Sequence, residues 1–265
     1  MLQVLVVTDS RGSNLEAYLK GEDSPDPVED LRKLCRVKVK VFKGADLQRL
    51  ENKITTLARD TNYDLILIIG GICSLTTRSK ERGLSLLHYI SQEERLASIK
   101  DTITRLDSTY KEKIHIARIP PACLRTYFSH FNKGQQIPGY LTDQQEDLLR
   151  DIQDINDHIT TINVNRHQER IDLDAKLLVQ SCKTSKTRSG RRRKKRPRTT
   201  FQGELLIDGV HATRDLEEKW YRRIAGTLYN WATKQEVVDT SFTSESDDPD
   251  TWRFKRPKRR RNSRH

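Results

Sequence analysis

The sequence is poor in cysteine, and its cysteines are not spaced for metal binding or redox chemistry. No two of the four form a Cys-x-x-Cys pair, and no histidine stands at metal-ligand spacing from any of them. Zinc modules and disulfide-stapled folds both need such clusters. The pattern therefore argues against both, and we expect no metal or other cofactor. The four cysteines are Cys35, Cys73, Cys123 and Cys182.

Long apolar runs are also missing. No stretch approaches the roughly 20 apolar residues that span a bilayer, and the N-terminal apolar run lacks the basic start and cleavage site of a signal peptide. Only 34% of the 265 residues are hydrophobic, whereas 32% are charged. A chain of this kind can form one α/β domain, but part of it is not expected to join a core. We expect an intracellular protein with no membrane span.

Acidic residues are absent from two segments that hold much of the basic charge. Residues 183–198 contain ten Lys and Arg and residues 253–265 contain eight, which accounts for the formal net charge of +12. The rest of the chain has 31 basic and 37 acidic residues, so its net charge is −6. The basic character therefore belongs to appendages, which disfavours a nucleic-acid surface spread over the whole domain.

These appendages set the predicted domain boundaries. We expect one domain over residues 1–234 with a disordered basic insertion at 183–200, followed by a disordered acidic-then-basic tail at 235–265. The densest basic runs are Arg191–Arg198 and Lys255–Arg264. Such runs serve as nuclear-import signals or contact nucleic-acid phosphates, and they can also be merely solvated. We expect an import receptor or nucleic acid as a partner and the nucleus as the location.

Strand and helix patterns alternate along the first two thirds of the chain. Short apolar or alternating runs predict strands at 2–7, 37–42, 64–69 and 113–119. Helical spacing predicts helices at 15–20, 46–58 and 80–110, another that begins at Thr142 after a long aromatic loop over 122–141, and a last one over 216–231. Alternation of this kind predicts a three-layer α/β/α sandwich with a parallel, flavodoxin-like sheet. The run at 37–42 alternates apolar and basic residues, so it suits the sheet edge.

Small and polar residues follow three of the predicted strands directly. Ser10, Gly44 and Gly71 come after the first, second and third strands, and Asp208 and His211 precede the last helix. Ligands of parallel sheets bind at the carboxyl ends of the strands. A serine, a histidine with an aspartate three residues away, and glycine amides are the groups that acyl transfer uses. Each of these residues also has a simpler interpretation when taken singly. Ser10 could only cap a helix, Asp208 could likewise be a cap, and His211 could be a polar surface residue.

Four short motifs in this order resemble the conserved blocks of the SGNH (GDSL-type) hydrolases. They are Thr8-Asp9-Ser10, Gly44, Gly71-Ile72-Cys73-Ser74 and Asp208-Gly209-Val210-His211. The resemblance covers residues 1 to about 231. It implies a three-layer α/β fold with Ser10 as nucleophile, His211 as general base and Asp208 as the residue that orients it. It also implies an oxyanion hole made by Ser10, Gly44 and position 73. Domains of this kind also occur in proteins encoded by mobile elements.

The motifs depart from the family at the oxyanion hole. Cys73 stands where the family has an asparagine, and a thiol is a poor hydrogen-bond donor. Loss of one oxyanion donor costs on the order of 10²–10³ in rate. We therefore expect a weak ester or acyl hydrolase acting on a small substrate. The alternative is an inactive scaffold of the same fold that binds nucleic acid through its basic arms. Cys73 itself could be the nucleophile only with a nearby base and a lowered pKa, and the sequence indicates neither.

Overall fold

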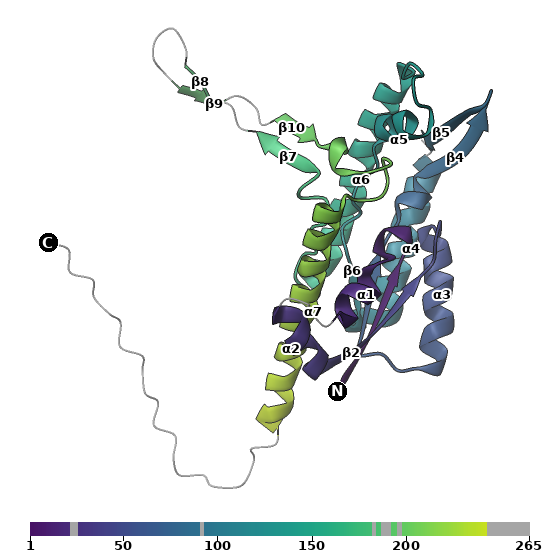
Figure 1. The fold of residues 1–265 in the computed structure, drawn as a ribbon. Helices are drawn as coiled ribbons and strands as arrows, with labels where there is room; N and C mark the ends of the chain where they lie inside the picture. Colours follow the sequence, from purple (N-terminus) through teal and green to yellow (C-terminus); the bar gives the residue numbers. More distant parts are fainter. Residues whose placement is uncertain (22–25, 91–92, 182–183, 187–191, 195–197, 243–265) are drawn as a thin grey trace, which may run out of the picture.

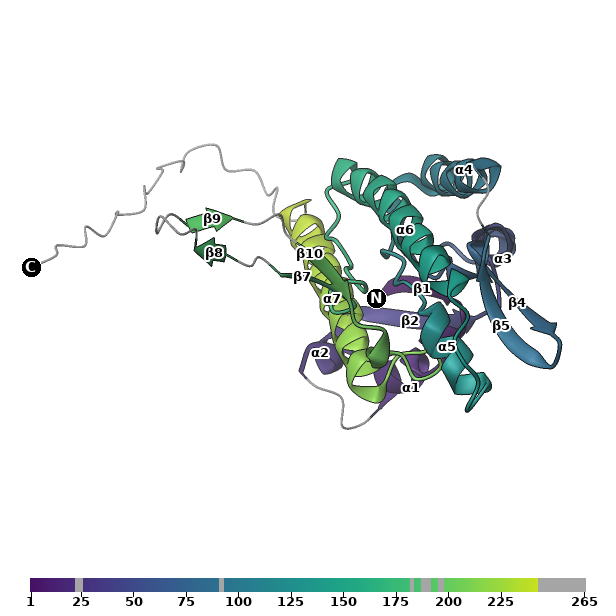
Figure 2. The same cartoon turned by 90° about the horizontal axis from the view of Figure 1, so that it is seen from above.

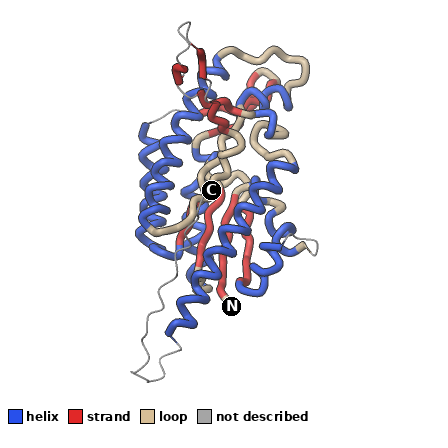
Figure 3. The backbone as a smooth tube through the Cα atoms, turned by 90° about the vertical axis from the view of Figure 1, so that its left-hand side faces the viewer, coloured by secondary structure: helices blue, strands red, loops and turns tan. Residues whose placement is uncertain are grey.

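The computed structural model describes residues 1–21, 26–90, 93–181, 184–186, 192–194 and 198–242. Its centre is a four-stranded parallel sheet in the order β2-β1-β3-β6. This places β2 at an edge, as the sequence predicted, and β3 inside the sheet. Figure 3 shows these strands side by side, with the loops that follow them gathered at one end of the sheet. The strands are β1 (Leu2–Thr8), β2 (Cys35–Val41), β3 (Leu65–Ile69) and β6 (Ile114–Ile116).

Helices cover both faces of this sheet (Figures 1 and 2). Successive side chains of a strand point to opposite faces, so β1 sends Leu5 and Val7 to one core and Val4 and Val6 to the other. The first core is closed by α3 (Leu47–Asp60), α4 (Glu93–Tyr110) and α6 (Tyr140–Asn165). The second is closed by α1 (Leu15–Lys20), α2 (Asp26–Leu34) and α7 (Arg214–Phe242). The predicted three-layer α/β/α sandwich is confirmed.

The prediction of one helix over 80–110 was wrong for its first part. The chain forms an antiparallel hairpin of β4 (Thr76–Glu81) and β5 (Leu84–Tyr89) before α4 begins at Glu93. The turn consists of Arg82 and Gly83, whose φ angles of 48° and 82° are both positive. Two such residues give the backbone twist that joins adjacent antiparallel strands. The apolar residues of β5 fit helical spacing as well as strand alternation, which explains the error.

The long loop predicted over 122–141 contains a helix instead. Helix α5 (Leu124–Phe131) buries Tyr127 and Phe128 in the first core, while Phe131 stays exposed. The next helix, α6, begins at Tyr140, two residues before the predicted start at Thr142, and continues to Asn165. Of the aromatic residues in this segment, Tyr127 and Phe128 therefore pack into the core.

The basic insertion is partly described. Its described residues form three short strands: β8 (Thr184–Lys186), β9 (Arg192–Lys194) and β10 (Arg198–Phe201). Strand β8 pairs with β9, and β10 pairs with β7 (Leu178–Ser181); both pairs are antiparallel. Helix α7 continues to Phe242, past the expected domain end at 234. The basic run Lys255–Arg264 lies outside the described residues, as do 191 and 195–197 of the other run. None of the described helices is long and apolar enough to cross a membrane.

Candidate active site

Ser10 lies immediately beyond β1, in a short 3-10 turn over Ser10–Gly12. The buried Asp9 carboxylate accepts the Arg11 backbone N–H at 3.0 Å and pairs with the Arg11 guanidinium at 3.2 Å. Arg11 also donates to the Pro120 carbonyl at 2.6 Å, which ties the turn to the loop after β6. A buried and fully paired aspartate and arginine therefore fix the backbone from which Ser10 projects.

Gly12 is required by the tightness of this turn. A Cβ atom at Gly12 would lie 2.3 Å from the Thr8 Oγ1 atom, closer than any real contact. The Thr8 hydroxyl donates to the Asp9 carbonyl at 3.2 Å. Thr8 thus packs inside the turn and leaves Ser10 at its outer side.

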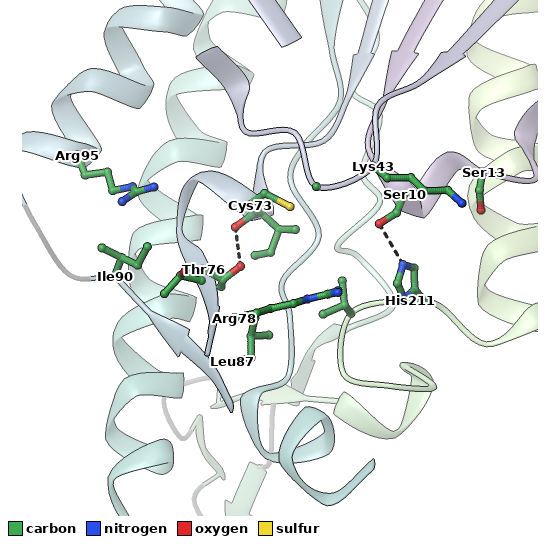
Figure 4. A pocket seen from close by; sticks show the side chains of 14 residues that line it. Ser10, Ser13, Lys43, Cys73, Thr76, Arg78, Leu87, Ile90, Arg95 and His211 are labelled. Atoms are coloured by element: carbon green, nitrogen blue, oxygen red, sulfur yellow. Dashed lines mark hydrogen bonds between the residues drawn. The ribbon is translucent and has the colours of Figure 1, made fainter. Parts of the chain in front are cut away.

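His211 and Asp208 reach Ser10 from the loop before α7. The Ser10 hydroxyl donates to His211 Nε2 at 3.0 Å (Figure 4), and His211 Nδ1 lies 2.8 Å from Asp208 Oδ2. The other carboxylate oxygen of Asp208 accepts the backbone N–H groups of Val210 and His211 at 2.9 and 2.8 Å. The structure therefore brings the three predicted catalytic residues into one hydrogen-bonded chain.

These contacts determine that the Asp208 carboxylate is ionised and which nitrogen of His211 faces it with a proton. Burial alone would raise the pKa of Asp208, but hydrogen bonds from the His211 side chain and from the amides of His211 and Val210 hold that pKa well below its usual range. Asp208 is therefore ionised and can only accept, so the bond to it requires a proton on His211 Nδ1. With the proton on Nδ1, Nε2 is the ring atom placed to take the Ser10 proton, as a general base must.

The loop that carries His211 depends on Gly209. Its φ is +80°, and a Cβ there would lie 2.3 Å from the Cys123 carbonyl oxygen and 2.5 Å from the Tyr127 nitrogen. The Gly209 carbonyl accepts the Cys123 N–H at 2.7 Å. Close backbone packing against the start of α5 thus sets the position of the His211 loop.

A cavity of about 720 Å³ opens beside Ser10 and His211. Gly44 and Cys73 line the same cavity, so the structure gathers every predicted site residue there except Asp208, which lies behind His211. Figure 4 shows the labelled lining side chains converging from the ends of β1 and β2, from the β4–β5 hairpin and from α4. The lining residues are Ser10, Ser13, Lys43, Gly44, Ile72, Cys73, Thr76, Thr77, Arg78, Leu87, Ile90, Arg95, Val210 and His211.

Backbone amides are available at this cavity for a developing oxyanion. Gly44 has a φ of +68° with open space where a Cβ would lie. No hydrogen bond between described residues engages the amide N–H of Ser10 or of Gly44. Unpartnered amide donors at a cavity are the geometry that stabilises negative charge on a reacting carbonyl oxygen.

Cys73 and Ser74 are adjacent in the chain but have different surroundings. Burial, followed by the nearby Asp9 carboxylate, raises the pKa of the half-buried Cys73 thiol. The thiol therefore stays protonated, which disfavours the alternative of a cysteine nucleophile. The Ser74 hydroxyl is buried and accepts the Leu47 N–H at 2.9 Å, so it caps α3 instead of facing the cavity.

No group of three or more His, Cys, Asp or Glu side chains within the described ranges is arranged to hold a metal ion.

Sequence reasoning missed Arg78 and Arg95, because it left Arg78 unassigned and placed Arg95 inside a single long helix. The residue pair Arg82-Gly83 was the available signal, since a glycine at such a turn marks a hairpin.

No protein-family model and no curated protein matches the sequence. The structure is similar to that of a lipase/acylhydrolase from Enterococcus faecalis, at a TM-score of 0.52 and 12% identity, covering 87% of this chain and 97% of that one. For a GDSL-like lipase from Bacteroides thetaiotaomicron the TM-score is 0.52 and the identity 11%, and the match covers 88% of each chain. For an acetylxylan esterase from Geobacillus stearothermophilus the TM-score is 0.52 and the identity 15%, and the match covers 86% of this chain and 94% of that one. The fold expected from the SGNH resemblance is thereby confirmed.

Proposed function

We propose that this chain, whose fold is that of the SGNH (GDSL-type) hydrolases, is a serine hydrolase that cleaves an ester or acyl group of a small substrate. The observation that carries the proposal is the hydrogen-bonded chain from Ser10 through His211 to Asp208 at the edge of a cavity. Nucleophile, base and orienting carboxylate in this geometry define acyl-transfer sites on unrelated folds. The likeness to lipases and an acetylxylan esterase supports the same class of reaction.

The reaction would proceed in two steps. Ser10 Oγ attacks the substrate carbonyl carbon while its proton passes to His211 Nε2, and the amides of Ser10 and Gly44 stabilise the oxyanion. The alcohol then leaves with the proton from His211, which gives an acyl-Ser10 ester. Water then attacks that ester while His211 takes one of its protons as base. The acid leaves, and Ser10 Oγ regains its proton from His211. Asp208 stays ionised and stabilises the protonated imidazole.

Hydrolysis of short-chain 4-nitrophenyl esters tests the proposal. The wild-type chain is expected to release nitrophenolate and Ser10→Ala to lose that activity, since the Ser10 hydroxyl is the one that hydrogen-bonds to His211 Nε2. Ser108→Ala on the exposed side of α4 is the matched control, because its hydroxyl contacts only the Arg105 carbonyl. Activity that survives in Ser10→Ala would refute the assignment.

We propose nucleic-acid contact as a second function. Its support is the run of ten Lys and Arg without an acidic residue in 183–198, part of which forms the β8–β9 pair, with Lys186 opposite Arg192. A two-stranded ribbon with cations on both strands suits phosphate contacts. Binding of single-stranded RNA or DNA should then weaken steeply with salt and disappear when 183–198 and 253–265 are deleted. Binding that is unchanged by both deletions would contradict this proposal.

Nuclear import through the same runs is a further part of this proposal. A fluorescent fusion of the full chain is expected in the nucleus, and replacement of Arg191–Arg193 by Gln should shift it to the cytoplasm. An unchanged distribution would contradict the import role of that run.

A further inference from the structure

The cavity beside Ser10 gathers positive charge in a domain that has no net charge. Its lining includes the three cations Lys43, Arg78 and Arg95 and no carboxylate. Residues 1–182 and 199–234, by contrast, hold 31 basic and 31 acidic residues. Acidic residues close to the site are engaged elsewhere, since Asp9 pairs with Arg11, Asp208 binds His211 and Asp46 accepts the Arg49 N–H at the start of α3. A local concentration of positive charge in a cavity attracts anions.

Arg78 projects from β4 into this cavity. Its guanidinium carbon lies 5.7 Å from the centre of the Tyr127 ring, which supports the side chain by a cation–π contact. Among the described residues no carboxylate pairs with it. Figure 4 shows the guanidinium pointing across the cavity toward His211. Arg78 therefore carries an uncompensated charge close to the reacting pair.

Arg95 and Lys43 extend the positive lining on either side. Arg95 comes from α4 and is half-buried, and its Nε donates to the Ser74 carbonyl at 2.5 Å. This bond uses one nitrogen and leaves the other two for a ligand. Lys43 stands beside Gly44 after β2, and Figure 4 shows it extending alongside Ser10 toward Ser13. Neither cation forms an ion pair with a described residue. Other arginines of the fold, such as Arg118, do pair with carboxylates.

From this lining we infer that the substrate is an ester carrying an anionic group, a carboxylate or a phosphate, which Arg78 binds while the ester carbonyl lies at Ser10. This inference rests on the proposed hydrolase function and names the substrate class of that site. A guanidinium binds carboxylates and phosphates through paired hydrogen bonds. Thr76 and Thr77 on the same strand add hydroxyl groups to this side of the cavity.

Two matched esters test the inference. The first is the 4-nitrophenyl monoester of glutaric acid, and the second is the same compound with its free carboxylate methylated. At low salt kcat/KM is expected to be about tenfold or more higher for the charged ester, since hydrogen bonds between charged groups contribute that much or more. Arg78→Gln should bring the ratio of the two values toward one, and Arg78→Lys should keep part of it.

Lys80→Gln is the matched control, because Lys80 lies on the same strand but does not line the cavity. It removes the same charge from the hairpin and should leave the ratio as in the wild-type chain. A third ester, in which a phosphonate replaces the carboxylate, shows which anion is preferred. A ratio near one in the wild-type chain, or a ratio that Lys80→Gln lowers as much as Arg78→Gln, would overturn the inference.

Equilibrium binding to Ser10→Ala separates this inference from the proposed function. Calorimetric titration should show tighter binding of the charged than of the methylated ester, with the difference lost in the Ser10→Ala, Arg78→Gln double variant. If this preference is found but the wild-type chain hydrolyses neither ester, the hydrolase proposal fails and the anion site stands. If both esters are hydrolysed and bound equally, the anion site fails and the hydrolase proposal stands.

Discussion

The Nε2 atom of His211 lies 3.0 Å from the hydroxyl oxygen of Ser10, although 201 positions separate the two residues in the chain. The contact forms because the turn after β1 and the loop before α7 meet at the carboxyl edge of the sheet. Each side is fixed by its own buried interactions, the Asp9–Arg11 pair on one and the Gly209 backbone on the other. Ser10 and His211 are thus held at reacting distance by packed structure.

Asp208→Asn is expected to lower kcat by about 10³–10⁴, the loss typical of removing this carboxylate from a catalytic triad. The ionised carboxylate keeps the His211 proton on Nδ1, whereas an amide can donate to that nitrogen and favour the wrong tautomer. Ester hydrolysis at constant pH measures the effect. Asp215→Asn, at an exposed position in the first turn of α7, is the control. A loss of less than threefold in Asp208→Asn would show that this carboxylate does not orient the base.

Cys73→Asn is expected to raise kcat by about tenfold to a hundredfold, because one oxyanion donor contributes on the order of 10²–10³. Cys73 lines the cavity and is only half-buried, so the larger amide has room there. The same ester assay measures the gain. Cys73→Ala should stay near the wild-type rate, since it removes only a weak donor. Equal rates in the Asn and Ala variants would mean that position 73 takes no part in the oxyanion hole.

The buried His115 should make the fold less stable in mild acid. Burial, only partly offset by its hydrogen bond to the Glu169 carbonyl, lowers the pKa of His115 from 6.5 to about 4. Between these values the unfolded chain binds the proton more strongly than the folded one. The stability is therefore complete above pH 6.5 and is lost as the pH falls toward 4, by about 2 kcal/mol at pH 5.

Urea unfolding at pH 7 and pH 5 measures this loss. In His115→Gln, which keeps a donor for the Glu169 carbonyl, the difference between the two pH values should shrink by about that amount. The same substitution at the exposed His130 is the control and should leave the difference as in the wild-type chain. If His115→Gln shows the full wild-type difference, His115 is not its source.

Gly209→Ala and Gly44→Ala form a matched pair of backbone tests. Both glycines have positive φ, so an alanine at either position costs about 1–2 kcal/mol. Only at Gly209 does the new Cβ also meet backbone atoms, 2.3 Å from the Cys123 carbonyl oxygen. Gly209→Ala should therefore lose a further ~1–3 kcal/mol of unfolding free energy in urea titrations. Similar losses for the two variants would mean that the loop before α7 relaxes freely.

Local patterns predicted the sheet and most helices because each depends on neighbouring residues. The apolar run of β3 is buried throughout, and the alternating run of β2 lies at the sheet edge, as expected. Prediction failed at 80–89, which was assigned to a helix, and at 124–131, which was assigned to a loop. There the turn at Arg82-Gly83 and packing against α6 decided the structure. The basic tail and its roles stay predictions.

By itself, the sequence determined that β1 ends just before Ser10, and it determined the turn that joins Asp208 to His211. Both depend on short-range effects: a buried apolar strand must stop where polar residues begin, and a carboxylate can accept the amides two and three residues ahead. Only the tertiary structure decided that these two segments meet, and that Arg78 and Arg95 reach the same cavity from a hairpin and from α4. Contacts between such distant segments depend on how whole elements pack, and no local pattern of residues specifies that packing.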